Sequence, residues 1–180
     1  MKILDTEQIN FFKNKGYLIL KDFVSQLDVK KYLKEMELLL TGSIDVGNQR
    51  NDLGGHKKKN TKNENITQIM LPSDFIPSLK KSIFFNKSKE VSIELLGRDM
   101  KRDMDMYIEK YPNTNTATPW HQDSAYWPKG MKDKRSLSCW LALDNAIIDN
   151  GCMWYVPGSH LEKTRIHKFA GKKSHALVAE

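Results

Sequence analysis

Residues 118–128 read TPWHQDSAYWP, a stretch in which one imidazole and one carboxylate stand two positions apart among aromatic side chains. In an extended segment successive side chains alternate between faces, so His121 and Asp123 point to one side and Gln122 points to the other. One metal ion could therefore contact both side chains. Two histidines and one carboxylate on one face of an octahedron are the ligands of non-heme Fe(II) oxygenases. The stretch thus predicts part of a metal site.

The composition is that of a single domain large enough to form a core, with 180 residues of which 39% are hydrophobic. The longest apolar runs, such as 38–40 and 141–143, fall far short of the roughly 20 residues that a membrane helix needs. Residues 1–10 have neither the apolar core of a signal peptide nor an arginine-rich transit pattern. We therefore expect a soluble, cytoplasmic protein.

The two cysteines and the net charge exclude few classes of site or partner. Cys139 and Cys152 lie in apolar, strand-like segments, where buried free thiols are expected rather than a disulfide framework or a zinc site. The charge of +7 is compatible with a polyanionic partner such as nucleic acid or a CoA-linked substrate. The one dense lysine run, 57–59, lies beside His56 in an Asn- and Gly-rich segment, which favours a solvated loop.

The first hundred residues are predicted to be mainly helical. Residues 6–15 have an amphipathic pattern that stops at Gly16. Ser25 and Asp28 resemble a capping box, after which apolar residues recur at three- and four-residue steps as far as Leu40 and predict a core-facing helix. The other elements expected here are a strand at 17–20, a long loop at 43–65, a strand at 66–70, and helices at 79–87 and 88–96.

The second half has short strand patterns separated by turn residues, which is typical of an antiparallel sandwich or barrel. Strands are expected at 104–109, 136–143 and 152–156, and a turn at 157–160. In the middle strand, Trp140 lies between smaller side chains on one face. That position suits the lining of a cavity as well as an ordinary place in the core.

The order of these motifs resembles the phytanoyl-CoA dioxygenase family of Fe(II)- and 2-oxoglutarate-dependent oxygenases. The resemblance implies one α+β domain over residues 1–180 with a mainly β core. Its helical part, about 1–100, would pack on a double-stranded β-helix (jelly-roll, cupin-like) at about 101–180, incomplete at the C-terminus. The matching segments are GYLIL at 16–20, PWHQD at 119–123, AYW at 125–127, WLALD at 140–144 and NGCMWYVPGSH at 150–160.

The resemblance also implies roles for individual residues. His121 and Asp123 would be catalytic residues and the first two iron ligands, and a carboxylate at the second position points to hydroxylation. Met106 and Trp140 match positions that line the 2-oxoglutarate pocket. With Fe(II) as cofactor and 2-oxoglutarate as cosubstrate, O2 would serve to hydroxylate a small organic substrate. His160 is a hallmark of the family with a structural role, and it is not the third ligand.

The chain departs from the family after this hallmark. The family's third iron ligand is a histidine several tens of residues beyond the Pro-Gly-Ser-His turn, followed by a serine and an arginine that bind 2-oxoglutarate. Only His167 and His175 follow His160 here, neither in that context, and Arg165 precedes both. We therefore expect a truncated form of a longer oxygenase, or closing strands missing for another reason. With two ligands, iron would bind weakly, which leaves open that this form is inactive.

Three functions remain from the sequence, in order of preference. The first is the dioxygenase, with a small-molecule substrate and O2 as partners. The second is a non-catalytic small-molecule binding module that keeps the fold and has lost the metal. The third is a nucleic-acid demethylase, for which the net charge of +7 is the motive and no base-flipping pocket can be argued. Neither the primary substrate nor the oligomeric state is indicated.

Overall fold

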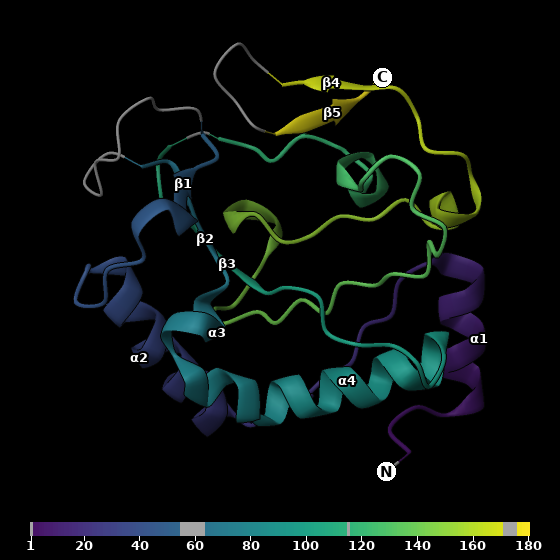
Figure 1. Cartoon of the computed structure of the whole chain (residues 1–180), viewed down its shortest axis with the longest axis horizontal. Helices are drawn as coiled ribbons and strands as arrows, with labels where there is room; N and C mark the ends of the chain where they lie inside the picture. The colour runs from purple at the N-terminus through teal and green to yellow at the C-terminus, as the bar shows by residue number, and fades with distance from the viewer. Residues whose placement is uncertain (1, 55–63, 115, 171–175) are drawn as a thin grey trace.

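Helices and short antiparallel strands make up the structure, a computed structural model of the chain (Figure 1). It describes residues 2–54, 64–114, 116–170 and 176–180, so the predictions for His56, the lysine run and His175 lie outside the described residues. The elements in order are α1 (Thr6–Lys15), α2 (Gln26–Leu40), η1 (Gly47–Gln49), β1 (Arg50–Asp52), β2 (Ile66–Met70), α3 (Pro72–Phe75), η2 (Pro77–Lys81), α4 (Ile83–Leu96), β3 (Met106–Lys110), η3 (Asp123–Tyr126), η4 (Ile148–Asn150), η5 (Ser159–Leu161), β4 (His167–Phe169) and β5 (Leu177–Ala179).

Helices α1 and α2 begin at capping boxes. At α1 the Asp5 carboxylate accepts from the Gln8 N–H at 2.8 Å, and the Gln8 side chain accepts from the Asp5 N–H at 2.9 Å. Ser25 and Asp28 make the same exchange at α2, which confirms the predicted box. Helix α1 ends at Gly16, whose φ of 80° is the left-handed conformation that glycine adopts without strain.

The prediction of two helices that meet between residues 87 and 88 is wrong. The structure has the 3-10 turn η2 followed by one helix, α4. The break falls at Ser82, which is extended and whose hydroxyl accepts from the Phe85 N–H at 3.2 Å. Ser82 is therefore an N-cap, and α4 continues without interruption through Lys87 and Ser88.

Three strands form an antiparallel sheet in the order β1-β2-β3, with Ile66 opposite Lys110 and Arg50 opposite Ile69. Strand β2 lies where it was predicted, and β3 lies within two residues of its prediction. Strand β1 is a correction, because it falls inside the predicted loop 43–65. Its short polar sequence gave no alternating pattern, and its pairing with β2 makes it a strand.

The core lies between α2 and this sheet. Residues of α2 that recur at helical spacing are buried, which confirms the predicted core-facing stripe. Partly buried side chains from the second half, including Leu141 and Leu143, pack against the same cluster. The buried members of the core cluster are Tyr32, Met36, Leu39, Val46, Ile69, Ile76 and Leu79.

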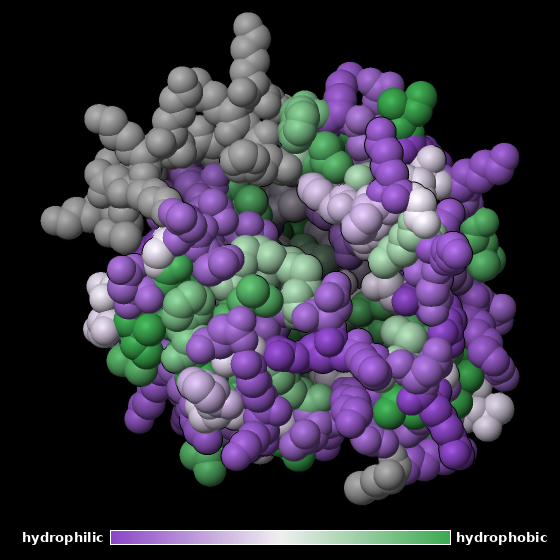
Figure 2. Space-filling view, in the orientation of Figure 1, coloured by the Kyte–Doolittle hydropathy of each residue, from purple (hydrophilic) through white to green (hydrophobic). Residues whose placement is uncertain are grey.

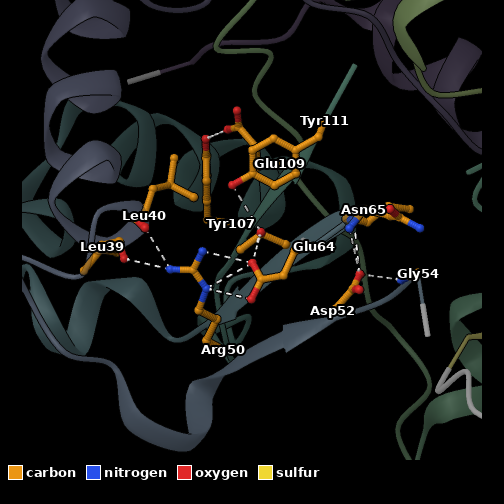
Figure 3. A network of polar contacts seen from close by, with 12 residues as sticks. Leu39, Leu40, Arg50, Asp52, Gly54, Glu64, Asn65, Tyr107, Glu109 and Tyr111 are labelled. Carbon is orange, nitrogen blue, oxygen red and sulfur yellow. Dashed lines mark hydrogen bonds and ion pairs between the residues drawn. The ribbon is translucent and has the colours of Figure 1, made fainter. Parts of the chain in front are cut away.

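A buried ion pair joins the end of α2 to the sheet (Figure 3). Arg50 donates to Glu64 through Nε at 3.0 Å and Nη2 at 2.9 Å, and these side chains are only 9% and 2% exposed. The Nη1 group of Arg50 donates to the carbonyl oxygens of Leu39 and Leu40, and Thr67 donates to Glu64. Arg50 thus satisfies carbonyl groups that the last turn of a helix leaves without partners.

Three predicted strands are not strands. Segments 17–20, 136–143 and 152–156 form no ladder among the described residues. Alternation shows which face of a segment would be buried, but a strand also needs a neighbouring backbone for its N–H and C=O groups. The cysteines in these segments are free as expected, yet Cys139 is exposed and Cys152 only partly buried, which corrects the prediction that both are buried.

A second, two-stranded antiparallel sheet, β4-β5, lies on the opposite side of the molecule from α4 (Figure 1). Within the described ranges the two sheets and the helices make an α+β architecture, and the predicted double-stranded β-helix is not closed. Many large apolar side chains of the second half are exposed, and Figure 2 shows apolar atoms around a hollow near the middle of one face. None of the helices searched in the described part is long and apolar enough to cross a membrane.

Candidate metal-binding site

The predicted pair His121 and Asp123 lies where an irregular segment passes into the 3-10 turn η3. Gln122 between them is extended, with φ −114° and ψ 127°, so the two side chains converge. The Nε2 atom of His121 is 3.5 Å from Oδ1 of Asp123. The Nδ1 atom of His121 is 2.7 Å from the carbonyl oxygen of Pro119, so in the neutral ring Nδ1 carries the proton. The Nε2 lone pair then faces the carboxylate and is available to a metal.

The two side chains shift each other's ionisation. The hydrogen bond to Asp123 raises the pKa of the His121 imidazole above its ordinary value of 6.5, and burial opposes this rise. The same bond lowers the pKa of the Asp123 carboxyl below 3.8. The Ser138 hydroxyl also donates to Asp123 at 3.4 Å. Because the Asp123 side chain is 65% exposed and His121 only 28%, the pair opens to solvent on its carboxylate side.

The aromatic residues of the stretch contribute to this arrangement. The rings of His121 and Tyr126 meet edge to face with their centroids 5.8 Å apart. The Tyr126 hydroxyl accepts the backbone N–H of Leu177 at 2.7 Å. Tyr126 therefore restrains the imidazole on one side and contacts the C-terminal hairpin on the other.

His167 lies behind the pair and is not placed as a third ligand. Its Nε2 atom accepts the backbone N–H of Gln122 at 2.9 Å, and its Nδ1 atom is 2.8 Å from the carbonyl oxygen of Arg165. Both ring nitrogens are therefore engaged by the protein. No spacing in the sequence indicated that His167 or Gln122 would contribute to this site, because the contact depends on how strand β4 packs against a residue 45 positions earlier.

The two residues predicted to line a 2-oxoglutarate pocket come from strand β3 and from the irregular segment 136–143. Trp140 is 51% exposed and follows Ser138, the residue that reaches Asp123, by two positions. Met106 is 47% exposed on β3, where its sulfur is 3.5 Å from Nε2 of Gln68. Neither makes a hydrogen bond or ring contact with His121 or Asp123 in the described part of the structure.

The donor set can be tested against Fe(II). One imidazole nitrogen and one carboxylate oxygen converge, and both are donor types found in the two-histidine, one-carboxylate set. Among the described residues, however, no group of three or more His, Cys, Asp or Glu side chains could hold a metal ion. His121 and Asp123 thus fit iron as two ligands, and the described side chains do not complete the set.

The chain matches a family model described as Phytanoyl-CoA dioxygenase (PhyH) over residues 12–176. It is 25% identical over 173 residues to a probable alpha-ketoglutarate-dependent hypophosphite dioxygenase of Stutzerimonas stutzeri, covering 95% of this chain and 59% of that protein. It is 24% identical over 186 residues to a phytanoyl-CoA dioxygenase of Arabidopsis thaliana, covering 87% and 65%.

A peroxisomal phytanoyl-CoA dioxygenase of Bos taurus is 26% identical over 186 residues, covering 93% of this chain and 51% of that protein. The matched region thus spans between 51% and 65% of the length of these three relatives. No solved structure gives a significant match to the chain.

Proposed function

Because the chain belongs to the phytanoyl-CoA dioxygenase family, we propose that His121 and Asp123 are two iron ligands of a 2-oxoglutarate-dependent dioxygenase that hydroxylates a small organic substrate. The observation that carries this proposal is the convergence of His121 Nε2 and Asp123 Oδ1 at 3.5 Å. The bond between His121 Nδ1 and the Pro119 carbonyl fixes the tautomer that a metal requires.

The surrounding residues receive roles that follow from their positions. Ser138 orients the carboxylate of Asp123 through its hydroxyl. Tyr126 limits rotation of the His121 ring through their edge-to-face contact. Trp140, two residues beyond Ser138, and Met106 would line the 2-oxoglutarate pocket. Bound Fe(II), with 2-oxoglutarate and O2, would supply the oxidant that converts a C–H bond to C–OH.

The fold proposal accompanies the functional one. We propose that residues 1–180 belong to a single oxygenase domain in which the segments after about residue 101 form part of a double-stranded β-helix. Segment 136–143 has the alternation of such a strand, and segment 152–156 is a short apolar run. Apolar side chains of both, such as Trp140 and Trp154, are exposed. A further strand beside them would bury that surface.

The substrate is proposed only as a class. Hypophosphite and phytanoyl-CoA are named for two of the relatives, and no described side chain near His121 selects between such different molecules. The exposed carboxylate side of the pair is where a substrate would approach.

Anaerobic titration with Fe(II) and 2-oxoglutarate tests the proposal, because a 2-oxoglutarate chelate of iron gives a metal-to-ligand charge-transfer band. We expect the band in the wild-type chain and its loss in His121→Ala and Asp123→Ala. Asp103→Ala is the matched control, since Asp103 is an exposed carboxylate outside the motif, and it should keep the band. If the wild type gives no band and His121→Ala gives the same spectrum, the dioxygenase proposal is wrong and the non-catalytic binding module remains.

A further inference from the structure

The C-terminal segment is hydrogen-bonded to the stretch that carries His121 and Asp123. Strands β4 and β5 and the three residues before β4 contact residues 120–126 at several points, although 40 or more positions separate the bonded residues in sequence (Figure 1). The contacts are the Ala179 N–H to the Trp120 carbonyl at 2.8 Å, the Gln122 N–H to His167 Nε2 at 2.9 Å, the Arg165 N–H to Gln122 Oε1 at 2.7 Å, the Leu177 N–H to the Tyr126 hydroxyl at 2.7 Å, and the Ser124 and Thr164 hydroxyls at 2.8 Å.

Two hydrogen bonds from the C-terminal segment hold Gln122. Its backbone N–H donates to His167, and its side-chain oxygen accepts from the backbone N–H of Arg165. Because Gln122 is extended, its side chain points away from those of His121 and Asp123. One face of the motif therefore presents the two candidate ligands, and the opposite face is bonded to the hairpin.

His167 can accept the Gln122 N–H in one tautomer only. Its Nδ1 atom lies 2.8 Å from the Arg165 carbonyl, which can only accept, so Nδ1 donates. Its Nε2 atom then has the lone pair that the Gln122 N–H requires. Arg165 fixes this tautomer through its carbonyl oxygen and bonds Gln122 through its N–H, so the two bonds to Gln122 depend on one short segment.

We propose that Gln122 and His167 are positioning residues that fix the backbone between the two candidate ligands, so that the His121 imidazole and the Asp123 carboxylate converge. Partners that orient metal ligands without touching the metal commonly determine its affinity. The metal-binding part rests on the proposed function, whereas the convergence of the two side chains can be tested without a metal.

Two substitutions remove the bonds and two keep them. Gln122→Leu and His167→Leu remove an acceptor in each half of the arrangement, while Gln122→Glu and His167→Gln retain an oxygen that can accept. Thr164→Val is the matched control, because it removes a bond between the same stretch and the same C-terminal segment without changing His121, Gln122 or Asp123. Circular dichroism verifies folding, and should either Leu variant not fold, the other decides.

The first readout is NMR of the full chain without metal. In the wild type and in Thr164→Val we expect a nuclear Overhauser contact between the His121 ring and the Asp123 β-protons, and slow exchange of the residue-122 amide. The Overhauser contact should be lost in both Leu variants. Slow exchange of the residue-122 amide should be lost in His167→Leu, which removes its acceptor. Both signals should be kept in Gln122→Glu and His167→Gln. Leu variants that keep the contact overturn the positioning role, whatever their metal affinity.

The second readout is Co(II) affinity, with Co(II) as a spectroscopic substitute for iron. We expect the Leu variants to bind about tenfold or more weakly, the loss typical of such orienting partners, and Thr164→Val to bind like the wild type. If all three variants weaken binding equally, the hairpin is merely a structural support and the proposal is wrong. If the wild type binds no metal but the NMR contact depends on Gln122 and His167, positioning stands and the proposed function fails.

Discussion

The Nε2 atom of His160 lies 2.9 Å from the carbonyl oxygen of Lys13, a contact that joins residues 147 positions apart. The backbone N–H of Gly158 donates to the Lys15 carbonyl at 2.9 Å. The Pro-Gly-Ser-His turn therefore supplies donors to the open C-terminal end of helix α1. These two hydrogen bonds are a physical basis for the structural role predicted for His160.

Gly16 leaves no room for a side chain at this junction, so Gly16→Ala should destabilise the protein strongly. Its φ is +80°, and a Cβ would overlap the His160 ring. Gly42→Ala is the matched control, because Gly42 has a φ of +77° with nothing within 4 Å of its Cβ position. The control should cost roughly 1–2 kcal/mol in urea unfolding, the cost of a left-handed alanine, and Gly16→Ala should cost more.

Most of the excess should disappear when His160 is also replaced. In a His160→Ala background we expect Gly16→Ala to cost little more than Gly42→Ala does, because the ring atoms at 2.3 and 2.6 Å are gone and only the Cβ of residue 160, at 3.1 Å, stays close. Equal costs at Gly16 and Gly42 in the wild-type background would contradict the packing of the turn on α1.

The buried ion pair predicts a second stability effect. Glu64→Ala leaves the Arg50 guanidinium in the core without its carboxylate, so the free energy of unfolding should fall by about 3–5 kcal/mol. Asp74→Ala removes the partner of Lys80 in a pair whose N–O distance is 2.7 Å but whose side chains are 44% and 50% exposed. That control should cost much less in the same denaturation experiment, because solvent screens an exposed ion pair. Similar losses for the two variants would mean that Arg50 finds another partner or reaches water.

A third prediction concerns the start of α4. Ser82→Ala removes the hydroxyl that accepts the Phe85 N–H, and it should cost about 1 kcal/mol. Ser92→Ala lies within the same helix, where the serine hydroxyl only donates back to the Lys89 carbonyl, so it should be neutral or slightly stabilising. Thermal unfolding followed by circular dichroism measures both. A loss at Ser92 equal to that at Ser82 would indicate that α4 does not start at Ser82.

Features that depend on neighbouring residues were predictable from the sequence. The capping box at Ser25, the stop at Gly16 and the strand β2 all follow from local pattern. The convergence of His121 and Asp123 also follows from the two-residue repeat of an extended chain, while their role as iron ligands stays a prediction.

Features that depend on distant backbone were not predictable. Alternation in 136–143 and the short apolar run 152–156 suggested strands, but neither pattern supplies the neighbour that a ladder requires. Strand β1 is the reverse case. Its polar sequence gave no strand pattern, and its pairing with β2 makes it a strand. For the same reason the sequence did not predict the contact of His167 with Gln122.

The ionisation of the candidate ligands gives a pH prediction for the metal-free protein. The raised pKa of His121 means that its ion pair stabilises the fold at low pH and that this contribution is lost as the pH rises through the raised pKa. The lowered pKa of Asp123 means that the contribution is present above 3.8 and is lost as the pH falls through the lowered pKa. The pair should therefore stabilise the protein most between pH 3.8 and 6.5, and only slightly, because Asp123 is largely exposed.

NMR titration of the His121 ring measures the shift directly. We expect a pKa above 6.5 in the wild type, and a lower one in Asp123→Asn because the charged partner is gone while burial still disfavours the imidazolium. Ser138→Ala is the control, since it removes a weaker contact to the same carboxylate and should change the His121 pKa little. Below its pKa the imidazolium has no lone pair at Nε2, so metal binding must release a proton and should weaken as the pH falls. An unchanged pKa in Asp123→Asn would show that the two side chains do not converge in solution.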